Sequence, residues 1–199
     1  MAEAGGVTSV GAVLLAGGRA RRMGGIDKPL LELGGRTLLA ASVDALTRAG
    51  VSPIVAVGPV LDADAPVDWV REEPPFGGPM AAIAAALPQL TGDWTLVIAG
   101  DLERPDAVVA RLLVEIAVET DADAVVFTAE GREQWLAGAY RTASLRAALA
   151  AVEIPAGASV RSVLGGLAIA WILDEDGVTR DIDAPADLDR ARAHLEESS

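Results

Sequence analysis

Residues 10–30 have the sequence VGAVLLAGGRARRMGGIDKPL, an apolar run that passes into a loop rich in glycine and basic residues. The first seven of them, 10–16, are continuously apolar and partly β-branched, which predicts a buried β-strand. Gly17 and Gly18 follow at once and predict that the strand ends there. Half of the chain is hydrophobic and only 4% is aromatic, which suits helices packed on a parallel sheet.

The rest of the chain alternates between short apolar runs and longer helical periods. Strands are predicted at 53–58, 67–71, 94–99, 123–128, 135–140, 167–173 and 178–182, with 135–140 at an edge of the sheet. Helices are predicted at 37–49, 79–90, 105–119, 142–151 and 159–164, and from Pro185 onward. This alternation predicts an α/β protein with a three-layer, Rossmann-like arrangement around a mostly parallel, mixed sheet. We expect one domain over residues 1–199, with residues 1–8 as a flexible tail.

The composition excludes several kinds of chemistry. The chain has no cysteine, which excludes disulfides, a thiolate nucleophile and cysteine-ligated zinc. Its one histidine, His194, falls on a predicted surface helix and is a poor candidate for a catalytic triad. The net charge of −13 argues against nucleic acid as a partner. The N-terminus lacks the pattern of a signal peptide and no apolar run is long enough to span a membrane, so we expect a cytoplasmic protein without a membrane partner.

The loop after the first strand has the features of an anion-binding site. Glycines let backbone N–H groups turn inward and form a nest for phosphate oxygens. Five basic residues gather here in a chain that is acidic overall: Arg19, Arg21, Arg22, Lys28 and Arg36. The cluster indicates a small anionic ligand, with a glycine-rich surface turn and a solvated charged face as the structural alternatives. The loop lacks the Rossmann fingerprint G-x-G-x-x-G. It is not a P-loop either, because a P-loop lysine is followed by Ser or Thr and Lys28 is followed by Pro29.

The stretch LAGGRARRMGGIDKPLLELGG, residues 15–35, strongly resembles the signature of the molybdenum cofactor guanylyltransferases, within the wider nucleotidyltransferases. The resemblance implies a nucleotidyltransferase fold in which the first loop holds the nucleotide and its phosphates, through Leu15, Ala16, Gly17, Gly18 and Arg19. It also implies that Lys28 contacts the α-phosphate region and acts catalytically together with Arg22 and Asp101.

The family places a magnesium-binding aspartate at the end of a central strand, and WTLVIAGD puts Asp101 at that point. Carboxylate oxygens are the ligands that hard cations prefer, although the same residue could instead cap the helix that begins at Pro105. Asp183, or its neighbour Asp181, is expected to complete the metal shell. This chain has Gly-Asp-Leu-Glu-Arg-Pro where the family often has Cys-Asp-Met-Pro, so we expect a different turn after the aspartate.

An acidic residue is expected to touch the nucleotide just before the family-like segment GGPMAAI, residues 77–83. Glu72 is the best positional match, and Glu73 is the neighbour that could replace it. Gly78 is expected to lie close to the bound nucleotide or pterin, where a helix begins.

Two later segments also resemble the family. DIDAPADL, residues 181–188, is similar to its closing motif, but Ala184 replaces the threonine that caps the last helix. By itself this replacement should weaken the cap by about 1 kcal/mol. QWLAGAYR, residues 134–141, and the Ala-Ser-Val-Arg after Gly157 are expected to face the acceptor substrate.

The resemblance implies transfer of GMP from GTP to molybdopterin or its molybdenum-loaded form, which releases pyrophosphate and forms molybdopterin guanine dinucleotide. Mg²⁺ is the expected cofactor, and molybdoenzymes or cofactor-delivery proteins are candidate partners. A phosphate nucleophile is already ionised, so no histidine base is required. The alternatives are a molybdopterin cytidylyltransferase, another nucleotidyltransferase that acts on a small phosphate, and a nucleotide-binding accessory protein without turnover.

Overall fold

The computed structural model describes residues 8–17, 27–118 and 121–197. In these residues a sheet of seven strands has the order β5-β4-β1-β6-β8-β7-β9. Its strands are β1 (Val10–Leu15), β4 (Ile54–Val57), β5 (Asp68–Val70), β6 (Trp94–Ala99), β7 (Ala124–Ala129), β8 (Arg132–Arg141) and β9 (Ile169–Leu173). Neighbouring strands are parallel except for β8, which is antiparallel to β6 and β7. The prediction of a mostly parallel, mixed sheet is therefore confirmed.

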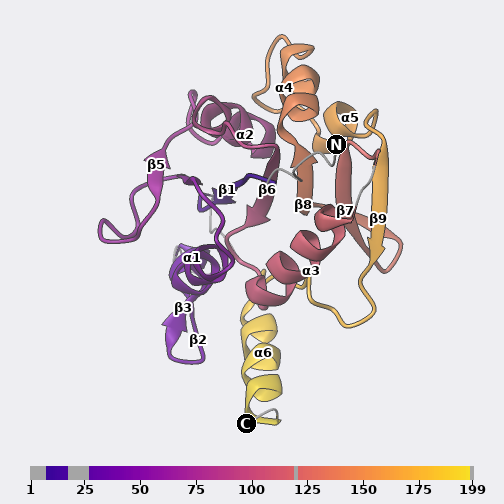
Figure 1. Ribbon diagram of the computed structural model, residues 1–199. Coiled ribbons are helices and arrows are strands. Elements are labelled where there is room, and N and C mark those ends of the chain that lie inside the picture. The colour runs from indigo at the N-terminus through magenta and orange to yellow at the C-terminus, as the bar shows by residue number, and fades with distance from the viewer. Residues whose placement is uncertain (1–7, 18–26, 119–120, 198–199) are drawn as a thin grey trace.

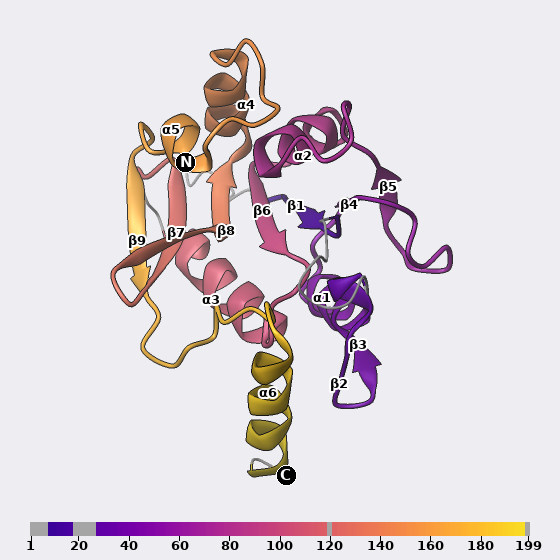
Figure 2. The ribbon, with the colours of Figure 1, turned by 180° about the vertical axis from the view of Figure 1, so that it is seen from behind.

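Helices cover both faces of this sheet and form the predicted three layers (Figures 1 and 2). One face packs against α1 (Leu38–Arg48) and α3 (Pro105–Ala117), and the other against α2 (Pro79–Ala86), α4 (Thr142–Ala150) and α5 (Val160–Leu164). Successive side chains of a strand point to opposite faces. Ala12 and Leu14 of β1 accordingly join the α1/α3 core, while Val13 joins the α2 core.

The remaining elements lie around the sheet. They are two short 3₁₀ turns, η1 (Lys28–Leu30) and η2 (Leu87–Gln89), a ribbon of β2 (Glu32–Leu33) and β3 (Arg36–Thr37), and α6 (Pro185–Glu197). The hydroxyl of Thr37 accepts a 3.1 Å hydrogen bond from the Ala40 N–H and caps α1. None of the described helices is long and apolar enough to cross a membrane.

The predicted edge position of residues 135–140 is wrong. They belong to β8, which lies inside the sheet between β6 and β7. Glu130 and Gly131 both have positive φ, 51° and 73°, as a tight hairpin turn requires, and they return the chain beside β7. The free side of β8 then pairs with β6.

The strand predicted at 178–182 is also wrong. In the described structure this segment is a loop, and its contact with other backbone is an isolated antiparallel bridge between Leu102 and Asp181. The N–H groups of Val178 and Thr179 bond to the buried carboxylate of Asp174. The loop therefore satisfies its backbone groups through a side chain and the turn after β6, away from the sheet.

Candidate active site

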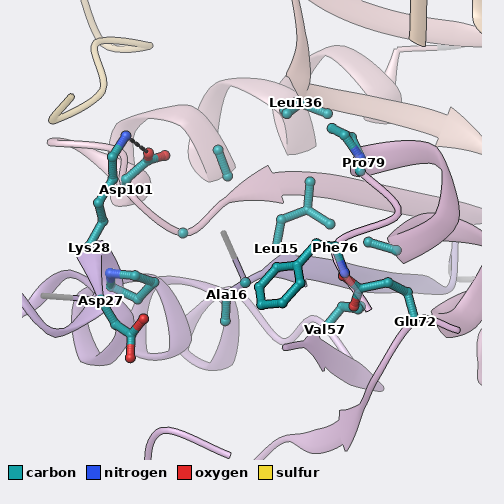
Figure 3. A pocket seen from close by; sticks show the side chains of 16 residues that line it. Leu15, Ala16, Asp27, Lys28, Val57, Glu72, Phe76, Pro79, Asp101 and Leu136 are labelled. Carbon is teal, nitrogen blue, oxygen red and sulfur yellow. Dashed lines mark hydrogen bonds and ion pairs between the residues drawn. The ribbon is translucent and has the colours of Figure 1, made fainter. Parts of the chain in front are cut away.

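A cavity of about 600 Å³ opens at the carboxyl ends of β1, β4 and β6. Its walls are formed by the ends of these strands, the η1 turn and the start of α2, and include Leu15, Ala16, Gly17, Lys28, Val57, Glu72, Phe76, Gly78, Asp101 and Leu136. Figure 3 shows two ends, with Lys28 and Asp101 at one and Glu72 and Phe76 at the other. Leu15 is the last residue of β1 and Ala16 follows it, and both line the cavity. This is the edge at which open α/β sheets bind ligands.

Two glycines allow the strand ends at the cavity to approach one another closely. A Cβ at Gly100 would lie 2.6 Å from the carbonyl oxygen of Leu15. Gly58 has φ 150°, and a Cβ there would lie 2.9 Å from the backbone nitrogen of Gly17. Any side chain at these positions would push apart β1 and the strands beside it. The backbone that enters the glycine-rich loop is therefore held from both sides.

The charged end of the cavity is organised around the ammonium group of Lys28. Its Nζ donates to Asp101 Oδ2 at 3.1 Å and makes a second, shorter hydrogen bond to Asp183 Oδ1. Partial burial would lower the pKa of Lys28, but the neighbouring carboxylates of Asp183 and Asp101 outweigh that effect and raise it. Lys28 is therefore protonated and presents a positive charge to the cavity.

Three carboxylates converge beside this ammonium. One oxygen from each of Asp101, Asp181 and Asp183 lies within 4.8 Å of the others. Removal of water from around the Asp181 carboxyl raises its pKa, and the negative charges of Asp183 and Asp101 raise it further. Oxygens bound to one Mg²⁺ are at most about 4.2 Å apart, because each lies about 2.1 Å from the ion. The donor type and spacing therefore fit a small divalent cation after a modest adjustment.

The opposite end combines one carboxylate with an aromatic ring. The Phe76 N–H donates to Glu72 Oε1 at 2.9 Å, and Phe76 itself has φ 64°. A positive φ is unusual for an aromatic residue and marks a constrained backbone. Phe76 is 54% exposed even though it lines the cavity. Two residues further on, Gly78 with φ 87° is the N-cap residue that precedes α2.

The structure brings most of the predicted site residues together. Leu15, Ala16, Gly17, Lys28, Glu72, Gly78 and Asp101 line the cavity, and Asp183 joins them through Lys28. Gly18, Arg19, Arg21 and Arg22 lie outside the described residues. Arg36 belongs to a different site, since its guanidinium pairs with Asp44 at 2.6 Å on α1. Glu73 is exposed and, among the described residues, does not contribute to the cavity wall.

The two segments expected to face the acceptor substrate both lie at β8. From QWLAGAYR, Leu136 lines the cavity, while the Tyr140 hydroxyl is buried and donates to the Trp135 carbonyl at 2.7 Å. In the segment after Gly157, Arg161 pairs with Glu133 at 3.2 Å. The sequence predictions did not include Phe76. An aromatic residue between Pro-Pro and Gly-Gly, in a chain with so few aromatics, is the signal that could have identified it.

Comparison with known proteins shows which family this chain resembles in sequence. The family model described as "MobA-like NTP transferase domain" matches residues 12–170. A probable molybdenum cofactor guanylyltransferase of Synechococcus elongatus is 38% identical over 144 residues, which cover 66% of this chain and 72% of that protein.

Solved structures share the fold. Molybdopterin-guanine dinucleotide biosynthesis protein A of Archaeoglobus fulgidus has a TM-score of 0.70 at 21% identity, over 94% of this chain and 98% of its own. The 2-C-methyl-D-erythritol 4-phosphate cytidylyltransferase of Thermus thermophilus has a TM-score of 0.68, also at 21% identity, over 94% and 99%. The fold is thus common to proteins named for different nucleotides, and the sequence match makes the assignment: this chain belongs to the MobA-like NTP transferase domain family.

Proposed function

We propose that this protein transfers GMP from GTP to molybdopterin, or to its molybdenum-loaded form, and so makes molybdopterin guanine dinucleotide. The observation that carries the proposal is the meeting of Lys28, Asp101 and Asp183 at the carboxyl ends of the central strands, in the cavity that Gly17 also lines. The 38% identity to a probable molybdenum cofactor guanylyltransferase supports both the donor and the acceptor.

The reaction needs a positive charge where the α-phosphate reacts. An oxygen of the acceptor phosphate forms a bond to the α-phosphorus, and the bond from that phosphorus to the leaving pyrophosphate breaks. Lys28 keeps its proton and lies at this end of the cavity, so it can donate hydrogen bonds to the α-phosphate oxygens as their negative charge grows. Charge stabilisation and alignment of the two phosphates are then the main contributions of the protein.

We propose Mg²⁺ as the cofactor, with Asp101 and Asp183 as its protein ligands and Asp181 beside them. Mg²⁺ would supply charge neutralisation of the triphosphate and of the leaving pyrophosphate. The carboxylates that now contact Lys28 are the same ones that would hold the ion. In the loaded enzyme Lys28 would then be available to the phosphate.

The far end of the cavity suits a guanine base. Guanine carries two adjacent hydrogen-bond donors, N1–H and N2–H, which match the two oxygens of one carboxylate. Glu72 supplies such a carboxylate on the wall opposite Lys28 and Asp101. The exposed ring of Phe76 lies beside it and would pack on a planar base.

The test is equilibrium binding of GTP, CTP and UTP to the purified protein, with Mg²⁺ and with EDTA. We expect a metal-dependent preference for GTP, followed by pyrophosphate release when molybdopterin is added. A preference for CTP would favour the cytidylyltransferase instead. Binding of GTP without pyrophosphate release, for any acceptor phosphate, would favour an accessory protein.

A further inference from the structure

Arg190 links the first turn of α6 to the turn after β6, which carries Asp101. Its Nη1 donates to Asp187 Oδ1 at 2.7 Å, and its Nη2 makes a short hydrogen bond to Glu103 Oε1. The Glu103 side chain is only 6% exposed, and Arg190 is 37% exposed. Glu103 lies two residues after Asp101, so the ion pair ties α6 directly to the turn that bears that carboxylate.

Backbone hydrogen bonds connect this turn with the loop that carries Asp181 and Asp183. The N–H of Glu103 donates to the carbonyl of Arg180 at 2.9 Å, and the N–H of Ile182 donates to the carbonyl of Asp101 at 2.9 Å. The Asp187 carboxylate accepts a 3.1 Å hydrogen bond from the N–H of Asp183. The backbones of Asp101 and Asp183 are therefore held in register by a short antiparallel contact, with the ion pair at one end of it.

The same helix also contacts the segment that carries Lys28. Leu188 and Ala191 of α6 pack in a small core with Leu31 and Leu38, and Leu31 closes the η1 turn that begins at Lys28. Figure 1 shows α6 leaving the layered body beside α3, close to the β2–β3 ribbon. One helix thus contacts both the turn that follows Asp101 and the segment that carries Lys28.

The chemistry of the Glu103–Arg190 ion pair points to a role in positioning the loops more than in stabilising the fold. Taking the Glu103 carboxylate out of water offsets much of its attraction to Arg190, so an apolar contact would serve stability about equally well. The Nε of Arg190 is also buried without a hydrogen-bond partner among the described residues. What the pair provides is a fixed direction, because a guanidinium donates its hydrogen bonds to carboxylates in its own plane.

We infer that Glu103 and Arg190 are positioning residues, whose ion pair holds Asp101 and Asp183 at the spacing needed to share one divalent cation. The inference rests on the proposed function for the reaction that the cation serves. It gives a role to Glu103 in the Leu-Glu that follows Asp101, where the family often has Met-Pro. Partners that orient metal ligands in this way typically change metal affinity or activity about 10- to 100-fold when they are removed.

The experiment compares Arg190→Gln, Glu103→Gln, their double variant and the swapped pair Glu103→Arg with Arg190→Glu. Arg192→Gln is the matched control, because Arg192 lies on the same helix and its ion-pair partner, Asp189, is 3.9 Å away and exposed. Mn²⁺ alone is the probe for the carboxylates, measured by electron paramagnetic resonance. Amide hydrogen exchange at Ile182 and Glu103 reports the contact between the loops, and thermal unfolding checks that each variant folds.

We expect Arg190→Gln and Glu103→Gln each to weaken Mn²⁺ binding about 10-fold or more, with faster exchange at both amides. The double variant should be no weaker than the single ones, and the swap should recover part of the affinity. The control should bind Mn²⁺ like the wild type. Wild-type Mn²⁺ affinity in both single variants would overturn the inference, as would a wild type that binds no Mn²⁺. Normal Mn²⁺ results with a wild type that shows no GTP binding would overturn only the proposed function.

Discussion

The carboxylate of Asp187 accepts a 2.8 Å hydrogen bond from the backbone N–H of Ala184, at the start of α6. In a capping box, the residue at this third helical position bonds back to the N–H of the cap residue. The family threonine is missing at Ala184, but this half of the box remains, and the hydrogen bond from the Asp183 N–H adds to it. The helix start is therefore better capped than the alanine alone predicts.

Replacing Asp187 with alanine should lower the free energy of unfolding by about 1 to 2 kcal/mol, because two N–H groups lose their acceptor. Chemical denaturation would measure the loss. Asp189→Ala is the control, since Asp189 lies two residues further along the same helix and its side chain is 79% exposed. An equal effect of both substitutions would show that the loss comes from helix charge and not from capping.

Removal of the Lys28 ammonium should act on catalysis far more than on folding. We expect Lys28→Ala to reduce kcat about 10²- to 10³-fold, which is the usual cost of removing one preorganised donor from a developing charge. The rate of pyrophosphate release at saturating GTP measures the effect. Arg36→Ala is the control, because the Arg36 guanidinium pairs with Asp44 outside the cavity. An unchanged kcat in Lys28→Ala would rule out the proposed role.

Base selectivity should depend on Glu72. In Glu72→Gln an amide N–H₂ replaces one acceptor oxygen and would face a guanine donor, so GTP should bind about 10- to 100-fold more weakly. CTP binding should change much less. Calorimetric titration of both nucleotides measures the ratio, and Glu73→Gln is the neighbouring control on an exposed side chain. A parallel loss for GTP and CTP would mean that Glu72 supports the loop rather than reads the base.

The layered fold could be predicted from the sequence because it depends on local patterns. Continuous apolar runs such as WTLVIA at 94–99 can be buried only as interior strands, and β6 has those bounds. The order of the strands depends on pairing between distant segments, which no local pattern contains. The position of β8 followed from a two-residue turn at Glu130, where a glutamate adopts a left-handed conformation without any sequence signal for it.

The charged site could be predicted only one residue at a time. Lys28, Asp101 and Asp183 are spread over most of the chain, and the family motifs identified each of them separately. Their meeting depends on α6 and on the contact between Glu103 and Arg190, whose spacing along the chain carries no periodicity. Charge pairs of this kind emerge from tertiary packing, so composition and spacing could not indicate them.

Buried Asp174 should make the loop before the closing motif sensitive to acid. Burial alone would raise its pKa, but hydrogen bonds from Thr179 and Val178 and the charge of Arg111 outweigh it and hold the pKa below the ordinary 3.8. Ionised Asp174 therefore adds stability at every pH above 3.8, and this contribution disappears as the pH falls through the lower, folded pKa. We expect Asp174→Asn to lower the free energy of unfolding by about 2 kcal/mol at pH 7, because hydrogen bonds to a charged group are lost. The difference from the wild type should shrink progressively as the pH falls below 3.8. Urea unfolding of wild type and variant between pH 7 and pH 2.5, with exposed Asp176→Asn as control, would test this, and a difference that is independent of pH would contradict it.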